Sequence, residues 1–258
     1  MDWRRLTTRA IAETIALAGT FRPPRAGLRV LMYHALGSPV IGDERGIFSV
    51  PPALFEAHMT ILGTLGSTVV TDISRQHASN ERLRVVITFD DGYADNLRIA
   101  GPVLEHRGYP FTVFAVSEFV RQGMKSFLSP HELRELASRP GVTIGAHGAT
   151  HIPLTQCDDR ILENELLSSK HCLEDITGKP VTTMAYPYGA VDHRVRAAAD
   201  RAGYTYGFTS HFDINSPSRD PLLMARTSIL KADNARVFRQ KLRGDWDWYR
   251  WRATDPAS

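Results

Sequence analysis

Two short segments of the chain carry the residues whose types and spacing suggest chemistry. Residues 88–93 read Thr-Phe-Asp-Asp-Gly-Tyr and place the adjacent carboxylates of Asp90 and Asp91 at the end of an apolar run. Residues 147–151 read His-Gly-Ala-Thr-His and place two imidazoles four residues apart. One carboxylate and two imidazoles are three protein ligands for a divalent metal, with a position left for water, as in catalytic sites. The other carboxylate is then free to act as a base, so the two segments together predict metal-assisted hydrolysis.

Each of these segments also has an ordinary structural interpretation. Asp-Asp-Gly is a good turn sequence, and His147 and His151 could be one packed and one exposed histidine. Gly92 supports the metal hypothesis, because it permits an unusual backbone that would let Asp90 and Asp91 face one pocket. A cation would relieve the repulsion between those carboxylates. Imidazole ligands suit zinc and other first-row metals. Because these metals share ligand preferences, the sequence does not identify which of them binds.

A third segment, residues 185–190, reads Ala-Tyr-Pro-Tyr-Gly-Ala at the end of another predicted strand. It is either a rigid loop on the rim of the fold or a wall of the pocket. In the second interpretation the backbone N–H of Tyr188 points at a developing oxyanion.

Strands and helices alternate along the chain and must position these segments. Apolar runs predict strands at 28–33, 83–89, 111–116, 142–146, 182–186, 204–209 and 225–230. Alternation with helices predicts an α/β fold with a mainly parallel sheet. Seven strands favour a barrel or near-barrel, in one domain over residues 1–258. We expect two extensions, an N-terminal helix at about 1–20 and a C-terminal helical extension at about 233–258 that opens with a helix from 233 to 243.

The candidate site residues all occupy equivalent places in this pattern. Asp90, Asp91, His147, Tyr188 and His34 each follow directly on a predicted strand. In parallel barrels the chemistry gathers at the carboxyl ends of the strands. These side chains are therefore expected to meet.

Bulk composition narrows the function classes. The 258 residues are 43% hydrophobic and 23% charged, which is normal for a folded protein. The net charge is +3, without a Lys/Arg run long enough to predict a nucleic-acid partner. Trp and Arg gather at residues 3–5 and 248–252, as solvated helix ends or as a peripheral membrane contact. Cys157 and Cys172 make no disulfide framework and are expected as free thiols.

The N-terminal region shows no secretory signal. Glu13 interrupts the apolar stretch at 11–18, and no small-residue cleavage pattern follows. No segment reaches about 18 uncharged apolar residues, so no transmembrane helix is expected. A cytoplasmic location is therefore favoured over export.

Taken together, the three motif segments resemble the polysaccharide deacetylases of the NodB-homology type, carbohydrate esterase family 4. The motifs occur in the family's order, and the resemblance covers roughly residues 28 to 230. It implies a distorted (β/α)7 barrel and removal of an acetyl group from an N-acetylated sugar. In that family the first Asp is the general base, which carries over here to Asp90. The second Asp and both histidines bind one divalent ion, which carries over to Asp91, His147 and His151, with zinc ahead of cobalt, nickel or manganese.

Two departures from the family pattern matter. The family's third motif often has an Arg that orients the base, but Ala185 holds that place here. Arg226 is the candidate to supply the guanidinium, and a surface ion pair is its structural alternative. The usual late Leu-x-His general acid is also missing. The chain instead has Leu-Met-Tyr-His at 31–34, which resembles the subgroup that deacetylates poly-N-acetylglucosamine-type exopolysaccharides, with late motifs moved to the front.

On that resemblance His34 is expected to be the general acid, with Asp43 as a candidate to orient it. His211 is the second candidate. A packed residue at a strand end is the structural alternative for His34.

The expected function is metal-dependent removal of N-acetyl groups from an N-acetylhexosamine-containing polysaccharide or glycan. One alternative is a cytoplasmic deacylase of a lipid-linked or nucleotide-linked amino sugar. Another is a non-catalytic glycan-binding relative, which the complete set of Asp90, Asp91, His147 and His151 disfavours.

Overall fold

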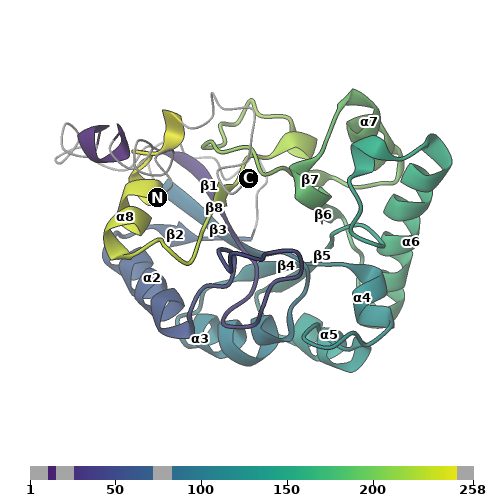
Figure 1. Cartoon of the computed structure of the whole chain (residues 1–258), viewed down its shortest axis with the longest axis horizontal. Coiled ribbons are helices and arrows are strands. Elements are labelled where there is room, and N and C mark those ends of the chain that lie inside the picture. Colours follow the sequence, from purple (N-terminus) through teal and green to yellow (C-terminus); the bar gives the residue numbers. More distant parts are fainter. Residues whose placement is uncertain (1–10, 16–25, 72–82, 249–258) are drawn as a thin grey trace.

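Seven parallel strands form the centre of the molecule, in the spatial order β7-β6-β5-β4-β3-β1-β8 (Figure 1). The computed structural model describes residues 11–15, 26–71 and 83–248. The strands are β1 (Gly27–Tyr33), β3 (Leu83–Phe89), β4 (Phe111–Ala115), β5 (Val142–Ala146), β6 (Thr183–Ala185), β7 (Tyr206–Phe208) and β8 (Thr227–Ser228). A two-residue strand that the sequence did not predict, β2 (Thr68–Val69), pairs with the start of β3. The predicted parallel α/β sheet is confirmed.

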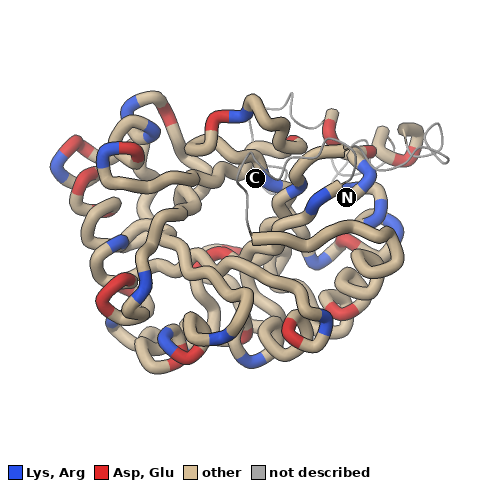
Figure 2. Tube along the Cα trace, turned by 180° about the vertical axis from the view of Figure 1, so that it is seen from behind, with Lys and Arg blue, Asp and Glu red and all other residues tan. Residues whose placement is uncertain are grey.

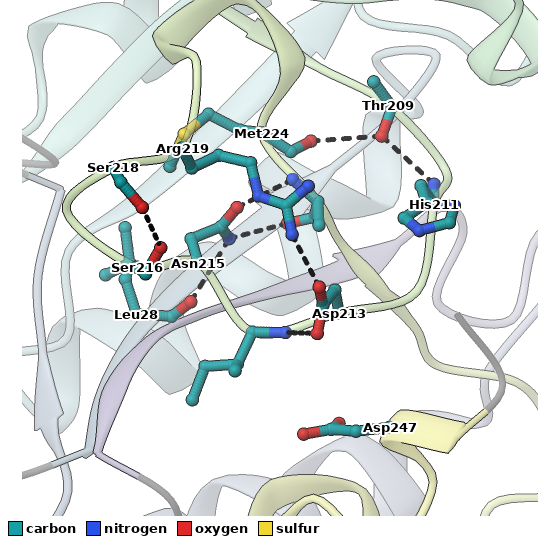
Figure 3. A network of polar contacts seen from close by, with 12 residues as sticks. Leu28, Thr209, His211, Asp213, Asn215, Ser216, Ser218, Arg219, Met224 and Asp247 are labelled. Atoms are coloured by element: carbon teal, nitrogen blue, oxygen red, sulfur yellow. Dashed lines mark hydrogen bonds and ion pairs between the residues drawn. The ribbon is translucent and has the colours of Figure 1, made fainter. Parts of the chain in front are cut away.

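The sheet curls until its two end strands meet. β8 pairs with β1 at Leu31–Thr227 and Met32–Ser228, and on its other side Met224, just before β8, forms a parallel bridge to Phe208 of β7. Because β8 pairs with only two residues of β1, the chain between β7 and β8 makes a further contact with the start of β1. Asn215 in this segment forms an antiparallel bridge to Leu28 of β1 (Figure 3). The predicted distorted barrel is confirmed, and its irregularity lies in this β7–β8 connection.

Helices follow one another around the outside of the sheet (Figure 1). They are α2 (Pro52–Thr64), α3 (Gly101–His106), α4 (Ser117–Arg121), α5 (Pro130–Ser138), α6 (Asp159–Thr177), α7 (His193–Arg201) and α8 (Ala235–Arg243). A π-helical turn, Asn96–Ala100, directly precedes α3.

Alternation along the strands separates an outer core from an inner one. In β1, Leu31 and Tyr33 belong to the large cluster between sheet and helices, whereas Leu28 and Val30 belong to a smaller cluster with Val86, Phe114, Phe208 and Met224. Successive strand residues point to opposite faces, so the smaller cluster fills the inside of the barrel.

Local signals set the ends of the helices. Ser129 caps α5 in a capping box with Glu132. Asn234 caps α8, and Gly244, in the left-handed region with a φ of 94°, ends it at Arg243. The predicted end of this helix at Arg243 is confirmed, because this backbone conformation breaks the helical hydrogen-bond ladder. Residues 249–258, and most of the N-terminal helix expected at 1–20, lie outside the described residues, although 11–15 are helical.

Several surface features bear on the remaining expectations. Within the described parts of the chain, no helix is long and apolar enough to cross a membrane. Cys157 and Cys172 are free, as predicted. Basic and acidic residues alternate along the outer elements in the Cα trace of Figure 2. Most of the Trp/Arg-rich ends falls outside the described residues.

Candidate active site

The site residues predicted from the motifs stand at the carboxyl ends of neighbouring strands. Asp90 and Asp91 follow β3, His147 follows β5, Tyr188 lies in the turn after β6, and His34 follows β1. Because the strands are parallel, these ends share one rim of the barrel.

The backbone after β3 makes room for two adjacent carboxylates. Asp91 has a φ of 69° and Gly92 a φ of 80°. Left-handed backbone at a residue other than glycine is uncommon and costs about 1–3 kcal/mol, which surrounding structure must offset. The sequence suggested the unusual backbone at Gly92, and the structure places it at Asp91 as well. Both Asp90 and Asp91 are buried.

Asp91 and the two histidines converge on a small volume. Asp91 Oδ1 lies 3.5 Å from His147 Nε2 and 3.4 Å from His151 Nε2. The ligand atoms of all three residues lie within 4.8 Å of one another. Two ligands of a tetrahedral zinc ion stand about 3.4 Å apart, so the spacing suits such an ion.

The environment of these three groups also suits a divalent cation. Asp91 Oδ1 is buried and has no hydrogen-bond partner among the described residues. Burial, reinforced by the neighbouring Asp90, raises the pKa of Asp91 to about 8, and a cation would relieve both effects. Residues Asp91, His147 and His151 therefore form a candidate metal centre.

Both imidazole rings are in the neutral form that a metal ligand requires. His147 Nδ1 lies 2.8 Å from the carbonyl oxygen of Ala185, a contact that places the ring hydrogen on Nδ1 and leaves the Nε2 lone pair facing Asp91. Burial lowers the pKa of His147, and burial together with His147 lowers the pKa of His151 to about 3. Both rings are therefore neutral near pH 7, the form that binds metals.

Asp90 is held by a buried arginine from a distant part of the chain. Arg226 Nη1 donates to Asp90 Oδ1 at 2.6 Å, and Arg226 Nη2 donates to Asp90 Oδ2 at 2.8 Å. Arg226 is 1% exposed and Asp90 2% exposed, so the alternative of a surface ion pair is wrong. Burial raises the pKa of Asp90, but the Arg226 guanidinium and His147 outweigh it and hold that pKa well below its usual range. Asp90 is thus a buried carboxylate that stays ionised.

The segment between β7 and β8 positions Arg226, and Figure 3 shows Thr209, His211 and Asn215 of this segment. Asn215 Oδ1 accepts from the backbone N–H of Ala225 at 2.8 Å, and Asn215 Nδ2 donates to the Ala225 carbonyl at 2.9 Å. Arg226 itself donates its backbone N–H to the His211 carbonyl and its Nε–H to the Thr209 carbonyl. The second candidate for the general acid, His211, is an exposed residue whose main chain supports Arg226.

His34 packs beside the candidate site, against a phenylalanine ring. Its ring centroid lies 4.6 Å from that of Phe48, and its buried Nδ1 has no hydrogen-bond partner among the described residues. The expected contact with Asp43 is not found within the described chain, because Asp43 Oδ2 instead accepts from the Phe48 backbone N–H at 2.7 Å. Burial lowers the pKa of His34 to about 4, against the opposing effect of Asp90. His34 is therefore neutral near pH 7.

Two polar residues that sequence reasoning missed hold the chain around His34. Asn96 Nδ2 donates to the His34 carbonyl at 3.0 Å, and Asp95 Oδ2 accepts from the Leu36 backbone N–H at 2.8 Å. Both residues stand just after the Asp90 motif, and that position was the available signal for them.

The turn after β6 is both a rigid loop and a side of the site. Tyr188 has a φ of 58°, and its largely exposed ring lies 4.7 Å from that of His151, centroid to centroid. A Cβ at Gly189 would lie 2.0 Å from Ser210 Oγ, so only glycine fits there. The buried Tyr186 donates its hydroxyl to the Leu222 carbonyl at 2.9 Å and anchors the turn.

Comparison with known proteins establishes the family. The family model described as Polysaccharide deacetylase matches residues 77–207, a range that contains the candidate metal centre, Asp90 and Tyr188 but neither His34 nor Arg226. The chain belongs to the polysaccharide deacetylase family, as its motifs predicted.

Individual relatives agree with this assignment. The chain is 31% identical over 214 residues to Bacillus subtilis YxkH, which carries the name of a polysaccharide deacetylase, covering 81% of this chain and 72% of that protein. The crystal structure of BA0330 from Bacillus anthracis, also named as a polysaccharide deacetylase, superposes with a TM-score of 0.74 at 28% identity, covering 84% of this chain and 69% of that one. The peptidoglycan-N-acetylglucosamine deacetylase PgdA of Listeria monocytogenes is 31% identical over 113 residues, only 43% of this chain and 23% of that protein.

Proposed function

We propose that this protein is a metal-dependent N-deacetylase that removes acetyl groups from an N-acetylhexosamine-containing polysaccharide or glycan. The observation that carries the proposal is the convergence of Asp91, His147 and His151 beside a separately held, ionised Asp90. Family membership supports the reaction class, and the name of the PgdA relative supports an N-acetylglucosamine unit in the substrate.

The candidate ligands and the base have distinct roles in this proposal. A divalent cation held by Asp91, His147 and His151, with zinc ahead of cobalt, nickel or manganese, would supply Lewis-acid polarisation of the acetyl carbonyl and acidify a water molecule. Asp90 accepts the proton of the attacking water as general base. Arg226 keeps Asp90 ionised and fixes the direction of its carboxylate by two parallel hydrogen bonds.

Two further groups act after the water has attacked the acetyl carbonyl. The Tyr188 backbone N–H donates to the oxyanion of the tetrahedral intermediate. His34 delivers a proton to the departing amine. Because the pKa of His34 is about 4 in the free protein, His34 must gain its proton in the substrate complex, where negative charge developing nearby raises that pKa.

The placement of the candidate acid supports the exopolysaccharide deacetylase subgroup. His34 directly follows the first strand of the barrel and precedes the 77–207 range that the family model matches. This is the placement expected when a late motif has moved to the front of the chain.

A saccharide screen with and without a chelator tests the proposed function. Acetate release is measured from N-acetylglucosamine oligomers, from a polymeric N-acetylglucosamine and from nucleotide-linked N-acetylglucosamine. We expect chelator-sensitive release from the oligomers or the polymer. Release from the nucleotide-linked sugar alone would favour the cytoplasmic deacylase, and binding without release in every case would favour a non-catalytic glycan-binding protein.

A further inference from the structure

The loop that carries both candidate imidazole ligands, residues 147–151, is clamped from behind by one buried carboxylate. Glu165 lies on α6 and is 2% exposed. Its Oε2 accepts from the backbone N–H of Ala149 at 2.8 Å and of Thr150 at 3.0 Å, and its Oε1 accepts from Thr150 Oγ1 at 2.6 Å. All three donors lie between the two candidate ligands.

The carbonyl groups of the same loop are satisfied by other elements. The Gly148 carbonyl accepts from Ser169 Oγ at 2.9 Å and from the Ser117 backbone N–H at 3.3 Å. The Ala149 carbonyl accepts from the Glu118 backbone N–H at 3.0 Å. For the N–H groups of Ala149 and Thr150, no acceptor other than the α6 carboxylate is found among the described residues, and a buried N–H group without an acceptor is costly.

The shape of the loop requires such external support. His151 has a φ of 63° and Gly148 a φ of 72°, and left-handed backbone at His151 persists only where its surroundings impose it. A Cβ at Gly148 would lie 3.1 Å from Glu165 Oε2 and 3.2 Å from Pro187 Cγ. The carboxylate therefore sits directly against the loop backbone.

We propose that Glu165 is a positioning residue for the candidate metal centre. It holds the 147–151 loop in the shape in which the Nε2 atoms of His147 and His151 both face Asp91. Without its carboxylate the loop N–H groups turn toward water, and the two imidazole nitrogens move apart. This inference rests on the proposed function, because it needs a cation that these ligands bind.

The test compares Glu165→Ala and Glu165→Gln with Glu163→Gln and the wild type, all as the full chain. Glu163 lies on the same helix and is exposed, so its substitution is the matched control. Each protein is stripped of metal and titrated with Zn²⁺ in competition with a chromogenic chelator. Titration with Co²⁺ reports the coordination geometry through visible absorption, and thermal unfolding of the metal-free protein reports stability.

We expect Glu165→Ala to weaken Zn²⁺ binding by about 10–100-fold and to alter the Co²⁺ absorption. Glu165→Gln has a smaller effect of the same kind, because one amide oxygen still accepts from both backbone N–H groups. Glu163→Gln behaves like the wild type.

Two outcomes would overturn the inference in distinguishable ways. If the Glu165 variants lower the unfolding midpoint but keep Zn²⁺ affinity within about twofold and the Co²⁺ spectrum unchanged, the glutamate has only a structural role. Should Glu165→Ala fail to fold, Zn²⁺ affinity and the Co²⁺ spectrum of Glu165→Gln decide between a positioning role and a purely structural one. A wild type that binds neither metal would instead remove the proposed function, and this inference with it.

Discussion

The two halves of the candidate site are built differently. The metal half, formed by Asp91, His147 and His151, comes from the middle of the chain, and two of its ligands lie on one five-residue loop. The proton-transfer half brings Asp90 together with Arg226 from the last strand, and His34 comes from the first. Local backbone geometry shapes the two ligand segments of the first half, whereas the second exists only once β8 pairs with β1 and Met224 bridges to β7, which closes the barrel. A short motif can therefore reveal the metal half, while the proton-transfer half depends on closure.

The largest effect is expected from breaking the metal half itself. His147→Ala removes one of the candidate ligands, so metal binding and turnover should fall together. Because a metal contributes several kcal/mol of charge stabilisation, we expect acetate release to drop by about three orders of magnitude or more. Metal content after dialysis and acetate release are the measurements. A variant that loses metal and retains full activity would contradict the assignment.

Asp90→Asn should separate the two halves. The amide cannot accept the water proton, so kcat should fall by about 10²–10⁴-fold, the usual contribution of a general base. Metal affinity should remain near that of the wild type, since Asp90 is not among the three candidate ligands. Parallel loss of metal would show that Asp90 belongs to the metal half.

Arg226→Met probes the closure of the barrel. It leaves a buried carboxylate without its partner, and breaking a buried pair costs about 3–5 kcal/mol of stability. Because Arg226 lowers the pKa of Asp90, its loss raises that pKa, so the acid limb of the kcat/KM profile should move to higher pH. Arg226→Lys keeps the charge but not the two parallel hydrogen bonds, and it should show a smaller shift. An unmoved acid limb in both variants would exclude Asp90 as the titrating base.

Comparison of His34→Gln with His211→Gln identifies which histidine is the general acid. Loss of a general acid lowers kcat by about 10²–10⁴-fold, and we expect this for His34→Gln. The exposed His211 side chain should matter little, because the main chain of that residue makes the contact with Arg226. Leaving-group dependence of the rate provides the control, since only loss of the acid should increase it. The reverse ranking would transfer the role to His211.

The smallest effect concerns the packing that ties the closing strands to their helices. Buried His58 on α2 lies 3.1 Å from the Tyr33 hydroxyl, and its Nε2 lies 2.6 Å from the Asp233 carbonyl ahead of α8. Burial lowers the pKa of His58 below 6.5, so folding favours the neutral ring. Its stabilising contribution is complete above about pH 6.5 and is lost as the pH falls toward the lowered pKa. Urea unfolding at pH 7.5 and 5.5 should show a smaller pH dependence for His58→Gln than for the wild type, and an equal dependence would contradict this account.

The metal half was readable from the sequence because its signals are local. Two carboxylates directly after one strand and two imidazoles four residues apart are each recognisable as short motifs, although the two motifs meet only through the pairing of β3, β4 and β5. Even so, the sequence placed the unusual backbone at Gly92, whereas Asp91 shares it. Helix ends were readable where a cap or a glycine marks them, as at Arg243, where Gly244 ends the helix predicted for 233–243.

The proton-transfer half was readable only in part. The sequence named Arg226 as a candidate without distinguishing a buried partner of Asp90 from a surface ion pair. It also suggested that Asp43 orients His34, whereas Asp43 bonds to the backbone of its own loop. Asn215 and Glu165 carried no motif at all, because their partners are backbone groups of distant segments.

The sequence by itself determined the residue types of the candidate metal centre, the alternation of strands and helices, and the family to which the chain belongs. Only the tertiary structure decided which carboxylate Arg226 neutralises and what holds the histidine loop. The physical reason is that backbone preferences depend on residues adjacent in the sequence. A buried ion pair, or a carboxylate that hydrogen-bonds to a distant loop, depends instead on which segments meet when the sheet curls.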